Sequence, residues 1–225
     1  MRGIVGVGLV LALATVPAGA QGEFRPEART ADALRKAAFA AIDSGEFAPA
    51  AARTRFYARA AALADSAVRL APNDPEVRIT KAIAAGRAAL AESPRERVKY
   101  AVVVREEALA TLRLKPAHAG AHHVLGMWHA EVMRLNRLAR FAARAFLGAS
   151  VFGEANWDEA RRELERAVEL EPERITHRLD LAGVLADRGD RAGARAQYEW
   201  ILRAPPRDFN DPAYKRLAAQ RLERL

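Results

Sequence analysis

The sequence predicts an all-helical protein built from stacked antiparallel pairs of helices. Alanine, the best helix former, is the most abundant of the 225 residues, whereas aromatic residues make up only 7%, too few for a large sheet. Four amphipathic stretches each run into a proline, because a proline cannot continue a helix. These stretches predict the second helices of four pairs, which stop before Pro72, Pro116, Pro172 and Pro206.

The spacing of the last two prolines, 34 residues, is the period of the tetratricopeptide repeat. The small residues Ala160 and Ala194 lie twelve positions before them, and the bulky Leu164 and Tyr198 lie eight positions before them. Small residues let two helices approach closely, and a bulky one fills the gap between them. We therefore expect a tetratricopeptide-like α-α superhelix of about four helical hairpins.

The earlier intervals are longer, at 44 and 56 residues, so the repeat is not regular. The extra length of the third unit predicts an insertion helix after its first helix, and the stretch from Asp211 predicts the capping helix that a solenoid needs at its end. Asn156 followed by Glu159 is typical of a helix start. In order, the expected helices cover residues 29–43, 48–70, 75–91, 95–114, 119–135, 137–147, 157–170, 175–187, 192–203 and 211–224.

The first twenty residues have the pattern of a cleaved export signal: a basic start, an apolar run over 4–16 and small residues that end at Ala20. A permanent membrane anchor is the alternative, but the run is shorter than the roughly 20 residues that cross a bilayer. We expect a signal peptide over 1–20, a disordered linker over 21–28 and the repeat domain over 29–225. The mature chain would then be periplasmic or secreted.

The sequence shows no arrangement of residues that is typical of an active site. With no cysteine, the chain has no thiolate nucleophile, disulfide or thiolate metal site. We find no nucleophile with a neighbouring base and no glycine-rich phosphate loop, so we expect neither an enzyme nor a cofactor. His118, His122, His123 and His129 could converge on a metal, but they lack the spacing of a known ligand motif. We expect them to have structural roles.

The inner wall of such a superhelix is formed by fixed positions of each first helix. Counting from the terminating prolines places five positions of each first helix on this wall, and in the last unit these include Gly183, Ala186 and Asp187. The side chains expected to form the groove are Ile79, Ile83, Arg87, His123, Met127, Glu131 and Leu179. The middle of the wall is then apolar. It predicts a groove for an apolar ligand or a partner helix, unless the insertion helix of this chain folds back into it.

A basic face is predicted in the third unit. Residues 95–144 carry ten basic and four acidic side chains, a net charge of +6 out of +8 for the whole chain. Arg134, Arg137, Arg140 and Arg144 recur at helical spacing, with leucine and phenylalanine between them. This pattern indicates either a solvated face above a buried apolar side or a surface for an anionic membrane or an acidic partner. The chain has no nucleic-acid-binding motif, and we expect no nucleic-acid partner.

At these residues the chain resembles the regulator of microtubule dynamics family. The likeness covers about Thr30 to Leu225 and is most specific at His123, Gly126 and Trp128, followed by the insertion with Leu147-Gly148 and the repeat ending at Pro172. The resemblance implies a tetratricopeptide-like fold. Family members are known for association with microtubules and for tethering at organelle contacts, and one has been linked to phospholipid transfer.

The function we expect is that of a non-catalytic, monomeric scaffold that binds a segment of another protein in its concave groove. The alternative is binding or transfer of a lipid or another apolar ligand in the same groove.

Overall fold

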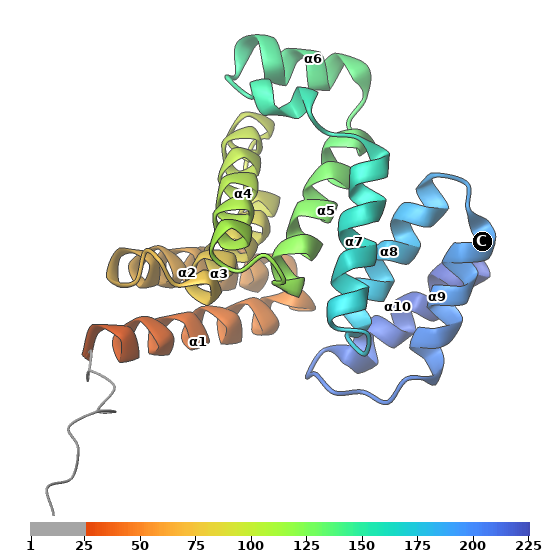
Figure 1. Ribbon diagram of the computed structural model, residues 1–225, viewed down its shortest axis with the longest axis horizontal. Coiled ribbons are helices and arrows are strands. Elements are labelled where there is room, and N and C mark those ends of the chain that lie inside the picture. The colour runs from red at the N-terminus through yellow and green to blue at the C-terminus, as the bar shows by residue number, and fades with distance from the viewer. Residues whose placement is uncertain (1–25) are drawn as a thin grey trace, which may run out of the picture.

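The computed structural model describes residues 26–225, and every regular element in this range is a helix (Figure 1). None of the helices in this range is long and apolar enough to span a bilayer. The predicted signal peptide and residues 21–25 lie outside the described residues. The elements are α1 (Pro26–Glu46), α2 (Ala50–Leu70), α3 (Pro75–Ala88), η1 (Ala89–Ala91), α4 (Pro94–Leu114), α5 (Ala119–Arg134), α6 (Arg137–Phe146), η2 (Ser150–Gly153), α7 (Trp157–Leu170), α8 (Ile175–Asp187), α9 (Arg191–Arg203) and α10 (Asp211–Glu223).

The helices form four antiparallel hairpins followed by a final helix. The first pairs α1 with α2, the second α3 with α4, the third α5 with α7 and the fourth α8 with α9, while α10 packs on α8 and α9. Between α5 and α7, α6 and η2 form the insertion (Figure 1). The predicted superhelix with an insertion helix and a capping helix is confirmed. One boundary differs, because α1 begins at Pro26 and residues 26–28 of the predicted linker are helical.

Most predicted starts and stops lie within two residues of those of the structure; the exceptions are both ends of α1 and the end of α3, where η1 continues the predicted helix. Three of the second helices, α2, α4 and α7, end two residues before the expected prolines, with the cap residues Ala71, Lys115 and Glu171 between. At the start of α7, Asn156 Oδ1 accepts a hydrogen bond of 2.8 Å from the Glu159 N–H, as the capping pattern predicts. Local residue chemistry therefore sets where these helices begin and end.

Small residues hold the paired helices close together. Ala160 and Ala167 of α7 are fully buried, and the backbone of Gly126 in α5 lies directly against Leu164 and Ala160. The largest core cluster continues from here through α8 and α9, with Ile175, Tyr198 and Ile201 in its centre.

The two ends of the superhelix meet. The Asn210 side-chain amide, at the start of α10, donates a hydrogen bond of 3.2 Å to the Asp43 carbonyl near the end of α1. The rings of Phe47 and Tyr214 pack edge to face beside it, with centroids 5.3 Å apart. Helix α10 therefore has two roles: it caps the last hairpin and it bounds one edge of the concave side.

Candidate functional site

A cluster of charged and polar side chains lies on the concave side of the superhelix. Its members are Glu46, Arg87, His123, Asp180 and Arg221, one from each of α1, α3, α5, α8 and α10, and we call them the inner polar cluster. A guanidinium nitrogen of Arg87 lies 3.0 Å from Glu46 Oε2, and His123 Nε2 lies 3.0 Å from Asp180 Oδ2. An ion pair and a histidine–carboxylate contact thus link helices that belong to different hairpins.

The cluster keeps Asp180 ionised. Burial alone would raise the pKa of this carboxyl, but the hydrogen bond from His123 and the positive charges around it hold the pKa below its usual value. Two of these charges are the guanidinium groups of Arg87 and Arg221. On α10, burial raises the pKa of Tyr214 well above its usual value, and the nearby charge of Glu46 acts in the same direction.

His123 also contacts a second histidine. Its Nδ1 lies 2.5 Å from Nδ1 of His177, so one of the two atoms must carry a hydrogen and donate it to the other. His177 is buried, and this burial lowers its pKa to about 4. His177 is therefore neutral at pH 7, and its hydrogen bond with His123 joins α5 to α8 on one side of the inner polar cluster.

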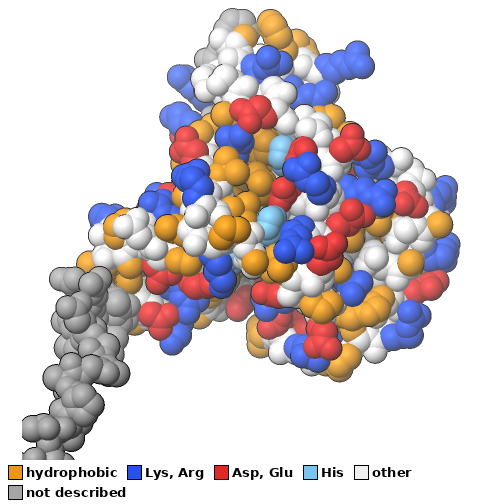
Figure 2. Space-filling model, viewed as in Figure 1, with side chains coloured by type: hydrophobic (Ala, Val, Ile, Leu, Met, Phe, Trp, Pro, Cys, Tyr) orange, Lys and Arg blue, Asp and Glu red, His pale blue; other side chains and the backbone are white. Residues whose placement is uncertain are grey.

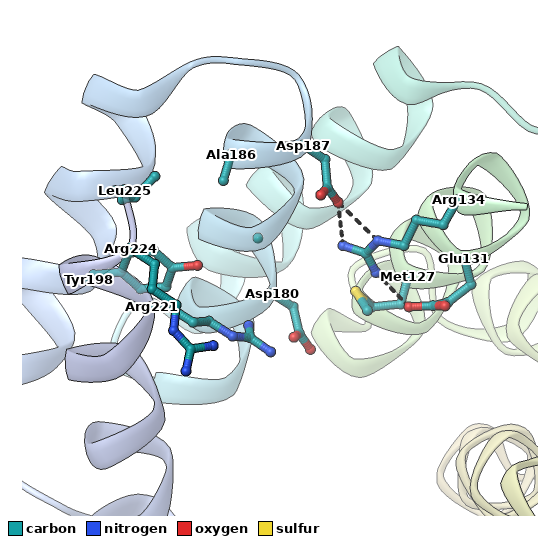
Figure 3. A pocket seen from close by; sticks show the side chains of 11 residues that line it. Met127, Glu131, Arg134, Asp180, Ala186, Asp187, Tyr198, Arg221, Arg224 and Leu225 are labelled. Atoms are coloured by element: carbon teal, nitrogen blue, oxygen red, sulfur yellow. Dashed lines mark hydrogen bonds and ion pairs between the residues drawn. The ribbon is translucent and has the colours of Figure 1, made fainter.

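An open pocket of about 410 Å³ adjoins this cluster between α5, α8 and α10 (Figure 3). Met127, Glu131 and Arg134 line one side from α5, while Arg221 of α10 and Arg224, directly after that helix, approach from the other. The remaining lining residues are Asp180, Gly183, Ala186, Asp187, Tyr198 and Leu225. The pocket carries both signs of charge around a small apolar floor.

Arg134 is fixed in this pocket by two carboxylates. Its guanidinium donates to Asp187 Oδ2 at 2.9 and 2.6 Å and to Glu131 Oε1 at 2.5 Å (Figure 3). Opposite it, the guanidinium of Arg221 approaches the same stretch of α8, and a Cβ built on Gly183 would lie 3.7 Å from a nitrogen of each arginine. The absence of a side chain at Gly183 therefore leaves an open floor between two guanidinium groups.

The predicted groove residues are only partly in this site. Met127 and Glu131 line the pocket, and Arg87 and His123 belong to the inner polar cluster. Ile79 and Leu179 do not face the groove: they are 2% and 3% exposed and pack in the cores between helices. Ile83 is partly buried against the core of the first two hairpins. The expectation of an apolar wall is wrong at Ile79 and Leu179, because these side chains are enclosed between helices.

The insertion helix does not fill the groove. Ala143 of α6 packs with Val98, Trp128 and Phe152 beyond the ends of α4 and α5, and no residue of α6 lines the pocket. Of the two alternatives that the sequence left open, a groove that is open or one that is filled by the insertion helix, the structure therefore shows the open groove.

The four arginines of the predicted basic face lie on two different helices, α5 and α6. Arg134 belongs to the end of α5 and to the pocket, because α5 stops there and Asn136 caps a new helix. Arg137, Arg140 and Arg144 lie on α6, where Arg140 donates to the Met133 and Leu135 carbonyls.

The predicted structural roles of the histidines can now be described. His118 caps α5, with Nδ1 accepting from the Ala121 N–H at 3.2 Å. His122 pairs with Glu163 at 2.5 Å and so links α5 to α7. Among residues 26–225, no group of three or more histidine and acidic side chains has the geometry of a metal site.

Asp180 and Arg221 were not among the side chains that the sequence placed on the inner wall, and Tyr198 was expected only to fill the space between two helices. In α8, Gly183, Ala186 and Asp187 line the pocket as the register of the prolines predicts, whereas Asp180 lines it in place of the expected Leu179. No local sequence pattern indicates that α10 contributes residues to the site, because this contribution depends on the contact between the two ends of the chain.

Comparisons with known proteins agree with this architecture. The family model for regulator of microtubule dynamics proteins 1–3 matches residues 22–225. The chain belongs to this family. Among solved structures, this family member is similar to a thermophilic tetratricopeptide-repeat protein of Thermus thermophilus, with 21% identity, a TM-score of 0.53, and coverage of 84% of this chain and 91% of that one. That likeness shows the tetratricopeptide-like fold.

A second structure is the pilF protein of Pseudomonas aeruginosa, which is 13% identical over 89% of this chain and 93% of that one. Its TM-score is 0.38, too low to add to the assignment. The search of curated proteins finds no match.

Proposed function

We propose that this family member is a non-catalytic scaffold that binds a segment of a partner protein in the pocket between α5, α8 and α10. The observation that carries the proposal is the open floor at Gly183 between the guanidinium groups of Arg134 and Arg221. A peptide backbone fits such a floor because its carbonyl groups accept from guanidinium donors. The carboxylates of Asp180 and Asp187 offer acceptors for its N–H groups and basic side chains.

The pocket favours a polar segment over an apolar ligand. Met127, Ala186 and Leu225 are the main apolar contributions to its lining, and charged side chains surround them. The side chains expected to hold a lipid chain, Ile79 and Leu179, are enclosed in the cores. Binding of a lipid in this groove is thus the weaker alternative.

The proposal can be tested by filling the pocket. Gly183→Leu places a side chain on the open floor, and its Cβ meets only ordinary contacts, so the fold should be retained. We expect at least about a tenfold loss of affinity for a peptide derived from a partner cross-linked to the native protein, measured by calorimetry, because contacts near the centre of an interface are worth about 1–2 kcal/mol or more. Ala192→Leu, on an exposed position of α9, is the matched control and should bind normally.

Equal binding by Gly183→Leu and the control would exclude the pocket as the peptide site. Native mass spectrometry separates the alternative: a lipid that co-purifies with the wild-type chain and is displaced in Gly183→Leu would favour the carrier function.

We also propose that the protein acts after export, with cleavage near Ala20. The support is the residue pattern of the first twenty positions. N-terminal sequencing of the protein from its native cells should begin at Gln21, and a chain that retains Met1 would contradict the proposal.

A further inference from the structure

The insertion helix α6 lies at one end of the molecule, beyond the tips of α4 and α5 (Figure 1). Its inner side is anchored by Ala143, which is buried against Val98, Trp128 and Phe152. Asn136 Oδ1 caps its start through a hydrogen bond of 2.8 Å to the Ala139 N–H. The orientation of α6 relative to the body is therefore fixed by packing.

The outer side of α6 exposes large apolar side chains. Leu138 is 75% exposed and Phe141 is 60% exposed, and the neighbouring Ala145 is also exposed. The exposed Arg137 and Arg144 flank Phe141 on the same side, since residues three and four apart share a helix face. The sequence left open whether the apolar side of this helix is buried, and the structure shows that Leu138 and Phe141 are not.

The charge around this face is of one sign. No aspartate or glutamate occurs between Glu131 and Glu154. Within the described residues, Arg137 and Arg144 make no ion pair. Lys and Arg side chains ring this end of the molecule in Figure 2, with hydrophobic side chains at its tip. The face combines exposed apolar groups with uncompensated positive charge.

We propose that α6 docks on the surface of a membrane that contains anionic lipids. Leu138 and Phe141 enter the boundary between the headgroups and the acyl chains, while Arg137 and Arg144 bind lipid phosphates. Charge complementarity selects this occupant, because a second copy related by two-fold symmetry would bring the same arginines face to face. A helix of ten residues also presents far less area than a stable protein interface requires.

The absence of cysteine from the sequence allows a local test on the full chain. Ala145→Cys places an environment-sensitive fluorophore on the outer side of α6, and Ala196→Cys places it on an exposed position of α9 as a control. We expect the α6 label to shift to the blue with vesicles of phosphatidylcholine and phosphatidylglycerol. It should not shift with phosphatidylcholine alone, and the α9 label should respond to neither.

Charge and apolar variants then test the two halves of the proposal. Arg137→Ala with Arg144→Ala should raise the lipid concentration at half-maximal signal by about 25-fold, because each arginine near an anionic surface contributes about fivefold. Leu138→Ser with Phe141→Ser should weaken binding about tenfold or more, since the apolar groups no longer enter the membrane. Arg191→Ala with Arg195→Ala, on exposed positions of α9, removes the same charge elsewhere and should leave binding unchanged.

Three results would overturn the proposal: no shift of the α6 label with anionic vesicles, an equal shift with neutral vesicles, or a shift that depends on protein concentration without any lipid. The last result would indicate self-association through α6. The test does not depend on the pocket, so Gly183→Leu should bind vesicles as the wild-type chain does.

Discussion

Replacing Gly126 with valine is expected to lower the free energy of unfolding by about 3 kcal/mol, the upper range for overpacking a close contact. A Cβ at this position would lie 2.8 Å from the Leu164 side chain. It would also lie 3.0 Å from the Ala160 carbonyl oxygen and 3.1 Å from the Leu164 backbone nitrogen. The backbone of α7 cannot yield at one point, so α5 and α7 must separate along their length. Urea unfolding followed by circular dichroism measures the loss.

Gly86→Ala is the matched control in α3. A Cβ there meets only Val104, at an ordinary distance of 3.6 Å. Because glycine costs a helix interior roughly 0.5–1 kcal/mol relative to alanine, this change should stabilise the protein slightly, whereas Gly126→Ala should destabilise it. If both alanine variants were stabilised, the close approach of α5 and α7 would not depend on Gly126.

The hairpins could be predicted from the sequence because their determinants are local. A proline stops a helix wherever it stands, and small residues at helical spacing indicate a close helix contact regardless of the partner. Even the irregular third unit was predictable, since the residues beyond the 34-residue period had to form an insertion. Gly126 falls within the predicted first helix of that unit, and in the structure it lies against Ala160 and Leu164.

The site could be predicted only in part because it depends on helix rotation and on chain closure. A one-residue change of register moves a helical side chain by about 100°. Leu179 and its neighbour Asp180 differ in this way, since Leu179 lies in the core and Asp180 lines the pocket, while Gly183 and Asp187 line the pocket as expected. The approach of α10 depends on the contact between Asn210 and Asp43, which are 167 positions apart. No sequence pattern within one repeat predicts a contact between such distant residues, so Arg221 was not expected in the site.

Acidification is expected to destabilise the protein through His177. Its pKa is about 4 in the folded protein because it is buried, and about 6.5 in an unfolded chain. Between these values the unfolded state binds a proton that the folded state does not, so acid favours unfolding. The contribution of His177 to the free energy of unfolding is intact above pH 6.5 and should fall by about 2 kcal/mol at pH 5 and by about 3 kcal/mol at pH 4.

The difference between the wild-type chain and His177→Gln isolates this contribution, since the carboxylates titrate in both proteins. Urea unfolding at several values between pH 7 and pH 4.5 should show a steeper loss for the wild-type chain. His122→Gln provides a control of opposite sign. The hydrogen bond with Glu163 raises the pKa of His122, so its contribution is present at low pH and is lost as the pH rises through the folded pKa. Parallel pH profiles for the wild-type chain and His177→Gln would mean that His177 is not held neutral against His123. The contact between α5 and α8 would then tolerate a charge at this position.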